Sequence, residues 1–463
     1  MQIQPLNMQD AYYLLHEGAL ALGRMEQQGM HVDVEYCQRE VARLTDRIQR
    51  LEVSLLKTNF VLRWQHYFGP KFNLHSDFQL SKMLYDVKKM KPAKLTLSGR
   101  GSVDEEALTM LGMPELSDLI TVGKLKKLKK TYLEAFLREQ VDGIIHTSLN
   151  LNLVSTFRSS SSSPNLQNVP KRDEEAMQIC RRAIIPRPGH QLMEADCSSI
   201  EVRVGACMHK DPTMLKYIND PKSDMHGDMA KQIYMIADFD RKLPAHKYLR
   251  DSAKGGFVFP QFYGDYYGNC AVNMACDWGK LPRSGKWKTG QGVPVSDAVN
   301  LADHLQDKGI YSLNDFTEHI KKIEDDFWGR RFRVYQQWKD RTYRQYQKRG
   351  YLDMLTGFRV SGVLTRNEVI NTPVQGSAFH CLLWAIIEID KIFQQEKLKS
   401  HMVMEIHDAL LIDTEPAEQE HVSEIIQYIS CEELPKAWPW IIVPLEIEIE
   451  TCPVDASWSE KGK

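Results

Sequence analysis

The sequence lacks the features of secreted, membrane-spanning and zinc-stabilised proteins. Its nine cysteines are odd in number, irregularly spaced and free of C-x-x-C pairs, which excludes an evident disulfide framework or zinc site. The longest apolar runs, such as residues 381–389, are much shorter than the roughly 20 residues that cross a bilayer. The N-terminus has no basic-then-apolar signal pattern. We therefore expect a cytoplasmic protein with reduced thiols, no targeting signal and no membrane partner.

The overall charge gives no sign of a nucleic-acid partner either. The net charge is only -2, so any such contact must come from a local concentration of Lys and Arg. The sequence also has no internal repeat. With 463 residues and 43% hydrophobic content, it predicts two or three subdomains around a substantial core.

An acidic residue follows a short apolar run in the middle of the chain. Residues 191–195 are typical of a buried strand, and Ser198-x-x-Glu201 is typical of a capping box that opens a helix. Asp196 is therefore predicted to lie where a strand ends and to be held rigidly there. Taken alone, such an aspartate is more often a turn residue or a helix cap.

A second acidic residue, near the C-terminus, has a similar setting. Residues 401–406 are apolar, His407-Asp408 follows, and residues 409–412 are apolar again. This pattern predicts a hairpin with Asp408 at its tip. If the two strands pair side by side, the carboxylates of Asp196 and Asp408 meet and can bind divalent metal ions.

A lysine-rich segment is predicted to form an amphipathic helix at residues 122–132. Five lysines occupy the seven positions from 124 to 130, while Leu125, Leu128 and Tyr132 recur at helical spacing. The basic face is either a solvated surface or a contact for a phosphate backbone, in which Lys124 and Lys127 would take part. Such a contact would be independent of base sequence and sensitive to salt.

The five serines at residues 159–163 suggest a flexible linker, but the rigid PNLQNVP run at 164–170 that follows favours an ordered segment. Further on, Asp224-x-His226 begins a predicted helix that runs to about residue 236. Arg250 and Lys254 lie four residues apart on the next predicted helix. Their cations share one face and either are simply solvated or hold a polyphosphate together with His226.

Residues 266–307 are predicted to be a loop-like surface excursion with a basic patch at 283–288. A long amphipathic helix is expected at residues 313–349, and Asn371 is expected to open an apolar helix that runs to about residue 393.

Six segments, in this order, resemble the polymerase module of family A DNA polymerases, the group typified by bacterial DNA polymerase I. No single segment is specific for this family, but the occurrence of all six in this order is. In addition, residues 22–33 resemble the stretch that begins this module. The segments are the PNLQNVP run at 164–170, the Asp196 motif, Asp224-x-His226, residues 250–264, Asn371-x-Pro-x-Gln-Gly at 371–376, and His407-Asp408.

The resemblance implies an α+β fold shaped like a right hand, with an antiparallel sheet in the palm and helical fingers and thumb. It places the N-terminal helices and thumb at residues 1–142 and the first part of the palm at 143–210. The fingers follow at 211–370, with the excursion at about 266–307 inserted in them. The second part of the palm is at 371–463.

The resemblance also implies a template-directed DNA polymerase that uses two Mg²⁺ ions, with primer–template DNA and dNTPs as partners in bacterial or bacterial-virus replication. Asp196, Asp408 and the backbone carbonyl of Cys197 would hold the metal ions, and Lys254 would also protonate the leaving group. The implied dNTP-binding residues are His226, Arg250, Lys254, Phe259, Tyr263 and Glu201, of which Glu201 would obstruct a ribose 2′-hydroxyl. The implied primer–template residues are Arg158, Asn371, Gln375, His407, Lys124 and Lys127.

The chain departs from the family pattern at several positions. Tyr263 lies nine positions after Lys254 where the family usually has eight, which predicts a bulge in the helix between them. This spacing favours Phe259 as the residue that stacks on the base, with Val258 in the competing register. In addition, Ala409 stands where the family has Glu, Cys197 stands where it often has Tyr, and Asn367 stands where it has Arg.

The family commonly carries a proofreading exonuclease before this module, and only about twenty residues precede the resemblance here. We therefore expect no 3′–5′ proofreading, either because the chain is truncated or because a separate exonuclease or replication factor supplies editing. Two other functions remain as hypotheses. A single-subunit RNA polymerase is disfavoured by Glu201 and Arg158, and a primer–template-binding protein without catalysis is disfavoured by the retention of both aspartates.

Overall fold

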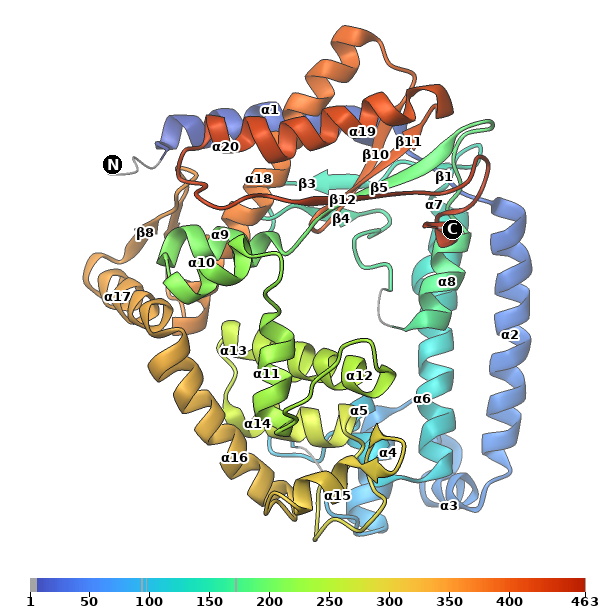
Figure 1. Ribbon diagram of the computed structural model, residues 1–463. Coiled ribbons are helices and arrows are strands. Elements are labelled where there is room, and N and C mark those ends of the chain that lie inside the picture. The colour runs from blue at the N-terminus through green and yellow to red at the C-terminus, as the bar shows by residue number, and fades with distance from the viewer. Residues whose placement is uncertain (1–5, 93–94, 97, 171–172, 463) are drawn as a thin grey trace.

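The largest sheet in the described residues is four-stranded and antiparallel, in the order β10-β11-β5-β12 (Figure 1). The computed structural model describes residues 6–92, 95–96, 98–170 and 173–462. The apolar runs of the sequence form three of these four strands, whose residues are almost all buried. The strands are β5 (Gln191–Cys197), β10 (His401–Ile406), β11 (Ala409–Thr414) and β12 (Ile447–Thr451).

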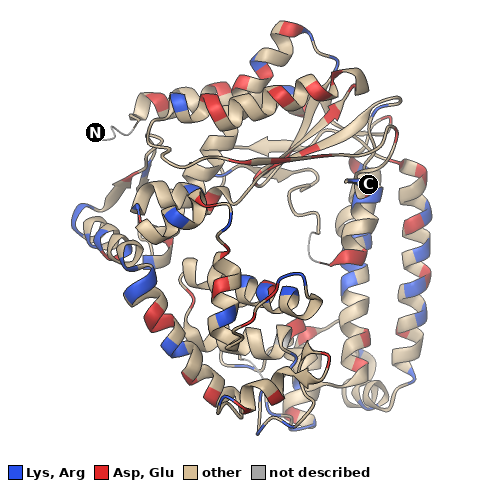
Figure 2. Cartoon of the chain, viewed as in Figure 1, with Lys and Arg blue, Asp and Glu red and all other residues tan. Residues whose placement is uncertain are grey.

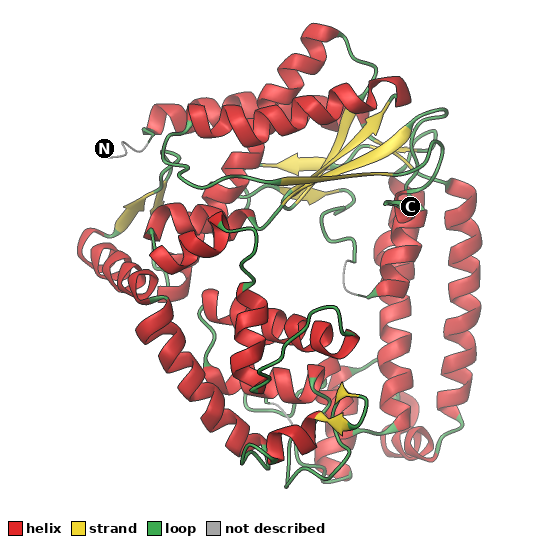
Figure 3. Ribbon diagram, viewed as in Figure 1, coloured by secondary structure: helices red, strands yellow, loops and turns green. Residues whose placement is uncertain are grey.

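Long helices cover one face of this sheet (Figure 3). α1 packs on β10 and on α18, which carries almost continuous buried apolar residues because it lies between other elements. We call the sheet, together with all the helices that lie around it, the sheet unit. Its helices are α1 (Met8–Gln28), α8 (Glu174–Arg182), α9 (Ile200–His209), α18 (Arg366–Glu396), α19 (Gln419–Tyr428) and α20 (Leu434–Ala437), with a π turn at Ile429–Glu433 and 3₁₀ turns at Pro416–Glu418 and Trp458–Glu460.

Two long antiparallel helices, α2 and α6, extend from the sheet unit and form what we call the helical arm (Figure 1). α1 is capped at Gly29, and α2 begins at Val34 after its N-cap residue Asp33. The predicted apolar stripe of Leu125, Leu128 and Tyr132 is buried in the arm. The arm contains α2 (Val34–Leu56), α3 (Asn59–Phe68), α4 (Asp77–Ser81), α5 (Glu105–Leu111), α6 (Pro114–Lys127) and α7 (Glu134–Glu139), a 3₁₀ turn at Gly69–Lys71, and π turns at Lys82–Val87 and Leu128–Leu133.

The remaining helices form a second group, which we call the helical block and which contacts the sheet unit through α9 and α18. The helix predicted around residues 246–263 consists of α12 and α13 joined by a π turn at Lys254–Val258, so the predicted bulge is confirmed. The block contains α10 (Pro212–Asn219), α11 (Met225–Tyr234), α12 (Pro244–Ala253), α13 (Phe259–Phe262), α14 (Tyr267–Val272), α15 (Leu301–Gln306), α16 (Leu313–Asp326) and α17 (Arg333–Arg349).

The predicted excursion at residues 266–307 is more ordered than expected. It contains α14, a π turn at Asn273–Trp278, α15, and a small sheet of β6 (Pro294–Ser296) and β7 (Val299–Asn300). Trp287 is buried in it, at 4% exposure. The loop prediction was wrong because frequent Gly and Pro residues are typical of loops, whereas the apolar residues between them pack on the rest of the block.

Three predicted element boundaries also differ. The long helix at 313–349 is interrupted by a π turn at Phe327–Arg331. α18 begins at Arg366, before the predicted start, because Thr365 and Glu368 form a capping box; Pro373 lies inside the helix. A strand is expected from the sequence at residues 441–450, but the observed strand is confined to Ile447–Thr451.

The serine run is part of a small sheet and not a linker. β4 (Ser160–Ser162) pairs antiparallel with β3 (Ser148–Asn150), which fixes the backbone beside Arg158. The other short strands are β1 (Met30–His31), paired with β2 (Ile144–Ile145), and β8 (Tyr351–Asp353), paired with β9 (Arg359–Ser361).

The sheet unit therefore carries two projections, the helical arm on one side and the helical block on the other (Figure 1). Charges of both signs are spread along the long helices of both projections (Figure 2). Among the described residues, no helix is both long and apolar enough to cross a membrane.

Candidate active site

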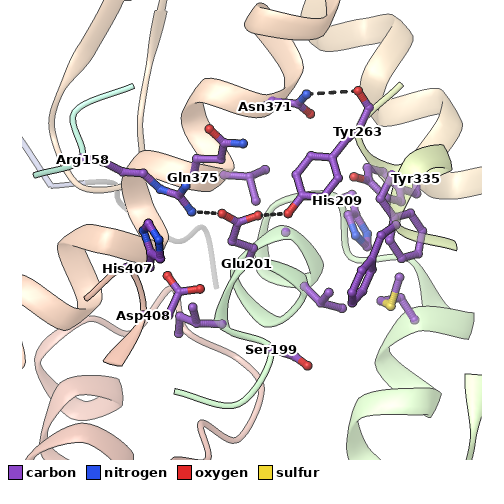
Figure 4. Close-up of a pocket in the computed structure, with 17 residues that line it drawn as sticks. Arg158, Ser199, Glu201, His209, Tyr263, Tyr335, Asn371, Gln375, His407 and Asp408 are labelled. Atoms are coloured by element: carbon purple, nitrogen blue, oxygen red, sulfur yellow. Dashed lines mark hydrogen bonds and ion pairs between the residues drawn. The ribbon is translucent and has the colours of Figure 1, made fainter. Parts of the chain in front are cut away.

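A cavity of about 550 Å³ lies where the sheet unit meets the helical block. Polar and charged side chains from both units enter it (Figure 4). Segments far apart in the sequence supply its lining, which includes Arg158, Glu201, Phe259, Tyr263, Asn371, Gln375, His407 and Asp408.

The carboxylate of Glu201 joins the two units across this cavity. Arg158 donates from Nη2 to one carboxylate oxygen, and the Tyr263 hydroxyl donates to the other (Figure 4). The Glu201 side chain is only 16% exposed, and Arg158 compensates its charge. The Asn371 amide donates to the Tyr263 carbonyl at 3.3 Å, which further fixes Tyr263 against α18.

The predicted capping box at the start of α9 is absent. The residue that caps this helix is Ser199, not Ser198, and its side chain makes no capping hydrogen bond. Ser199 has a φ of 53°, in the left-handed region, so the chain turns sharply after the strand. Glu201 therefore directs its carboxylate toward the cavity instead of back to the helix terminus.

Asp196 and Asp408 lie on neighbouring strand ends, as the sequence predicts. β11 pairs with β5 so that Ala409 is opposite Asp196, and the Cys197 amide donates to the Asp408 carbonyl at 2.9 Å. Asp408 is in the turn between β10 and β11. The preceding residue, His407, has a φ of 62°, so this turn contains a left-handed residue.

The donor set of these strand ends suits Mg²⁺. Mg²⁺ is typically held by one or two carboxylates, with water and substrate phosphates as its other ligands. Burial raises the pKa of the Cys197 thiol, and Asp408 and Asp196 raise it further, so Cys197 can offer only its carbonyl oxygen as a hard ligand. Within the described ranges, no three His, Cys, Asp or Glu side chains form a metal-binding group.

A second group of candidate residues lies on α11 and α12 in the helical block. Arg250 binds Asp224 through two nitrogens at 2.8–3.1 Å. Burial raises the pKa of Asp224, but hydrogen bonds from Arg250 and Gly227 outweigh it and hold the pKa below its ordinary value. Asp224 also caps α11, so it positions both this helix and Arg250.

His226 is close to the same cations. Burial, followed by the charges of Lys254 and Arg250, lowers the pKa of His226 to about 4, so the imidazole is neutral at neutral pH. Its Nδ1 is buried and has no hydrogen-bond partner within the part of the chain that the structure describes.

The π turn decides which side chain reaches the cavity. Phe259 lines it, contacts the His226 ring edge-on at a centroid distance of 5.6 Å and lies 5.4 Å from the Lys254 nitrogen. Val258 is completely buried in the block. Phe259 is thus the residue of the two that can contact a ligand.

The lysines of α6 differ in their partners. Lys124 pairs with Glu105 at 2.6 Å and lies 3.7 Å from Asp173. Lys127 is exposed and forms no ion pair with any residue that the structure describes. Both lie on the helical arm, away from the cavity at Glu201.

One polar cluster beside the cavity was not predicted. Glu405 is completely buried in β10 and accepts hydrogen bonds from Ser159 at 2.6 Å and Gln167 at 2.8 Å. Burial raises its pKa to about 7. The contacts tie the segment that carries Arg158 to the strand before Asp408. A single acid inside the apolar run at 401–406 was the available signal.

The fold is that of a DNA polymerase domain. The structure matches the POL domain of Pol1 from M. smegmatis, solved in complex with a DNA primer-template and dNTP, with a TM-score of 0.73 and 24% identity. The match covers 96% of this chain and 70% of that one. The chain belongs to DNA polymerase family A, whose model matches residues 37–277 and 315–460.

Curated relatives agree with this assignment. The chain is 27% identical to DNA polymerase I of Chloroflexus aurantiacus, over 98% of this chain and 43% of the relative. It is also 27% identical to the thermostable DNA polymerase I of Thermus thermophilus, over 94% of this chain and 47% of the relative. The chain thus spans a little less than half the length of these relatives. Residues 278–314 lie outside the family match, so the unmatched stretch begins later than the predicted excursion.

Proposed function

We propose that this chain is a template-directed DNA polymerase that adds deoxynucleotides to the 3′ end of a primer. The observation that carries the proposal is the pairing of β5 with β11, which brings Asp196 and Asp408 to neighbouring strand ends, with Asp408 in the lining of the cavity. Two bound Mg²⁺ ions would lower the pKa of the primer hydroxyl and stabilise the leaving pyrophosphate. Asp196, Asp408 and the Cys197 carbonyl would hold them.

In this proposal the sheet unit is the palm, the helical arm the thumb and the helical block the fingers. The palm supplies the carboxylates of Asp196 and Asp408 from the ends of neighbouring strands, which the backbone hydrogen bonds between β5 and β11 hold in place. The fingers supply the cations of α12, and the thumb supplies the lysines of α6. The cavity lies where palm and fingers meet, so a bound nucleotide would contact both.

Arg250, Lys254 and His226 would bind the triphosphate. Arg250 is already oriented by Asp224, and a triphosphate would take over part of that hydrogen bonding. His226 would act as a neutral hydrogen-bond donor, since its pKa is about 4. The ammonium group of Lys254, on the same helix face as Arg250, would protonate the leaving pyrophosphate.

Glu201, Tyr263 and Phe259 would define the sugar and base positions. A ribose 2′-hydroxyl in the cavity would meet the Glu201 carboxylate, both of whose oxygens already accept hydrogen bonds from Arg158 and Tyr263. Phe259 would stack on the incoming base. The site therefore favours deoxynucleotides over ribonucleotides.

Arg158, Asn371, Gln375 and His407 would contact the primer terminus and the minor groove. All four line the cavity on the side of Asp408 and α18. Minor-groove acceptors are nearly the same in every correct base pair, so such contacts test pair shape without reading sequence. Lys124 and Lys127 would contact the phosphate backbone of the duplex.

Primer extension on a defined template tests the proposal. The parent protein should extend a primer with dNTPs and Mg²⁺, and Asp196→Asn and Asp408→Asn should each lower the rate at least about 10³-fold. Circular dichroism and thermal unfolding would establish that both variants remain folded. Undiminished extension by either folded variant would refute the assignment of the carboxylates.

A further inference from the structure

The helical block and the helical arm touch at a point distant from the palm sheet. Arg283, in the loop between the π turn at Asn273–Trp278 and β6, donates from Nη2 to Glu106 on α5 at 3.1 Å. In Figure 1, α5 lies behind the helices of the block, at the end of the molecule opposite the sheet. Arg283 belongs to the stretch 278–314 that the family match omits.

The block holds the loop of Arg283 in place from both sides. Leu281 and Trp287 are 3% and 4% exposed. The Trp287 indole donates to the Pro282 carbonyl at 2.9 Å, and its amide donates to the Tyr311 carbonyl at 2.8 Å. The backbone at Arg283 is therefore fixed by buried anchors, and the guanidinium is presented to the arm from a folded support.

The arm presents two adjacent acids that have different partners. Glu105 and Glu106 lie in the first turn of α5. Glu105 binds Lys124 of α6 at 2.6 Å and so ties α5 to the rest of the arm. Glu106 accepts from Arg283 across the boundary. Glu105 thus ties α5 to α6, and the neighbouring Glu106 makes the contact with the block.

We propose that residues 278–314 form a clasp that joins fingers to thumb and encloses duplex DNA against the palm. The inference rests on the proposed function, which places the primer–template in front of the palm sheet. Arm and block diverge from the sheet unit, and the Arg283–Glu106 contact closes the circuit of elements between them (Figure 1). A duplex inside that circuit is retained whatever its sequence, because it cannot leave sideways while the clasp is closed.

The clasp is reversible. The Arg283 and Glu106 side chains are 26% and 37% exposed, and ion pairs in contact with water are weak and screened by salt. DNA can therefore enter when the contact opens, and the anchored loop returns Arg283 to the same position. Salt should shorten retention through this contact as well as through the lysines of the thumb.

Covalent closure of the clasp provides a topological test. Arg283→Cys combined with Glu106→Cys is loaded on primed circular DNA and then joined with a short bismaleimide; each single variant controls for the native thiols. We expect the joined protein to remain on a closed circle through a high-salt wash and to slide off once the circle is linearised. Failure of the two positions to join, or equal loss from circular and linear DNA, would overturn the clasp.

Charge reversal tests the ion pair itself. Arg283→Glu should increase dissociation from primed circles by about two- to fivefold, the range expected for an exposed ion pair, and adding Glu106→Arg should restore the parent rate. Arg359→Glu, which breaks the comparable Arg359–Asp353 pair within the β8–β9 hairpin, should have no effect. Retention on circles without any primer extension would refute the proposed activity but leave the clasp standing. Extension with unchanged dissociation in Arg283→Glu would refute the clasp alone.

Discussion

Replacing Glu201 by alanine should weaken the discrimination between deoxynucleotides and ribonucleotides. In the proposed site, a ribose 2′-hydroxyl would compete with the Tyr263 hydroxyl for one oxygen of Glu201, while Arg158 holds the other oxygen. The displaced bond has a charged acceptor, and such bonds contribute about 1.5–3 kcal/mol. Removing the carboxylate should thus lower the ratio of kcat/KM for dNTP over rNTP by about 10- to 150-fold.

Single-nucleotide incorporation with a matched dNTP and rNTP pair measures this ratio. Glu201→Gln is the matched control, because its amide keeps the size of the side chain and one acceptor oxygen, and it should give an intermediate ratio. Tyr263→Phe removes only the hydroxyl and should act in the same direction. If Glu201→Ala unfolds at the parent temperature and keeps the parent ratio within about twofold, the reasoning from the Glu201 hydrogen bonds is wrong.

Three further predictions concern charge. Burial raises the pKa of Glu405 from 4.5 to about 7, so the folded protein keeps a proton that the unfolded chain releases, and the free energy of unfolding falls as pH rises through this window. In urea unfolding, the free energy of unfolding of Glu405→Gln should exceed that of the parent by about 1–3 kcal/mol above the folded-state pKa of Glu405 and should nearly equal it below pH 4.5. The same difference between variant and parent at both pH values would contradict this prediction. Lys127→Ala should reduce the slope of log affinity for DNA against log salt by about 1, and Lys124→Ala by less, because Glu105 already holds Lys124. Binding titrations at several salt concentrations check the order of the two. Because the pKa of His226 is lowered to about 4, its ring signals in NMR should titrate near that value, and a midpoint near 6.5 would show that the ring is not buried beside these cations.

The order of the motifs was enough to predict the family and the position of the central carboxylates. Asp196 and Asp408 each follow an apolar run, and apolar runs of that length become buried strands. The nine-residue spacing from Lys254 to Tyr263 likewise predicted the π turn, because an extra residue in a helix has few other accommodations. These inferences depend on the spacing and polarity of residues that are close together in the chain, which can be seen directly in the sequence.

The failures have a common physical origin. Ser198-x-x-Glu201 fits a capping box, yet Glu201 finds stronger partners in Arg158 and Tyr263, which are remote in sequence. A local hydrogen bond to an amide was displaced by two tertiary ones, one of them from a cation. The excursion at 266–307 was predicted to be a loop because its apolar residues show no regular spacing. They indicate a folded segment only when the residues they pack against are known.

By itself, the sequence determined which apolar runs become strands, that Asp196 and Asp408 follow such runs, and that a π turn interrupts the helix after Arg250, because these depend on neighbours a few positions away. Only the tertiary structure decided that Glu201 links the sheet unit to the helical block, that Glu405 is buried beside the cavity, and that Arg283 meets Glu106. Each of these contacts joins segments that are distant along the chain. Their energies depend on burial and on partner distance, which no local pattern encodes.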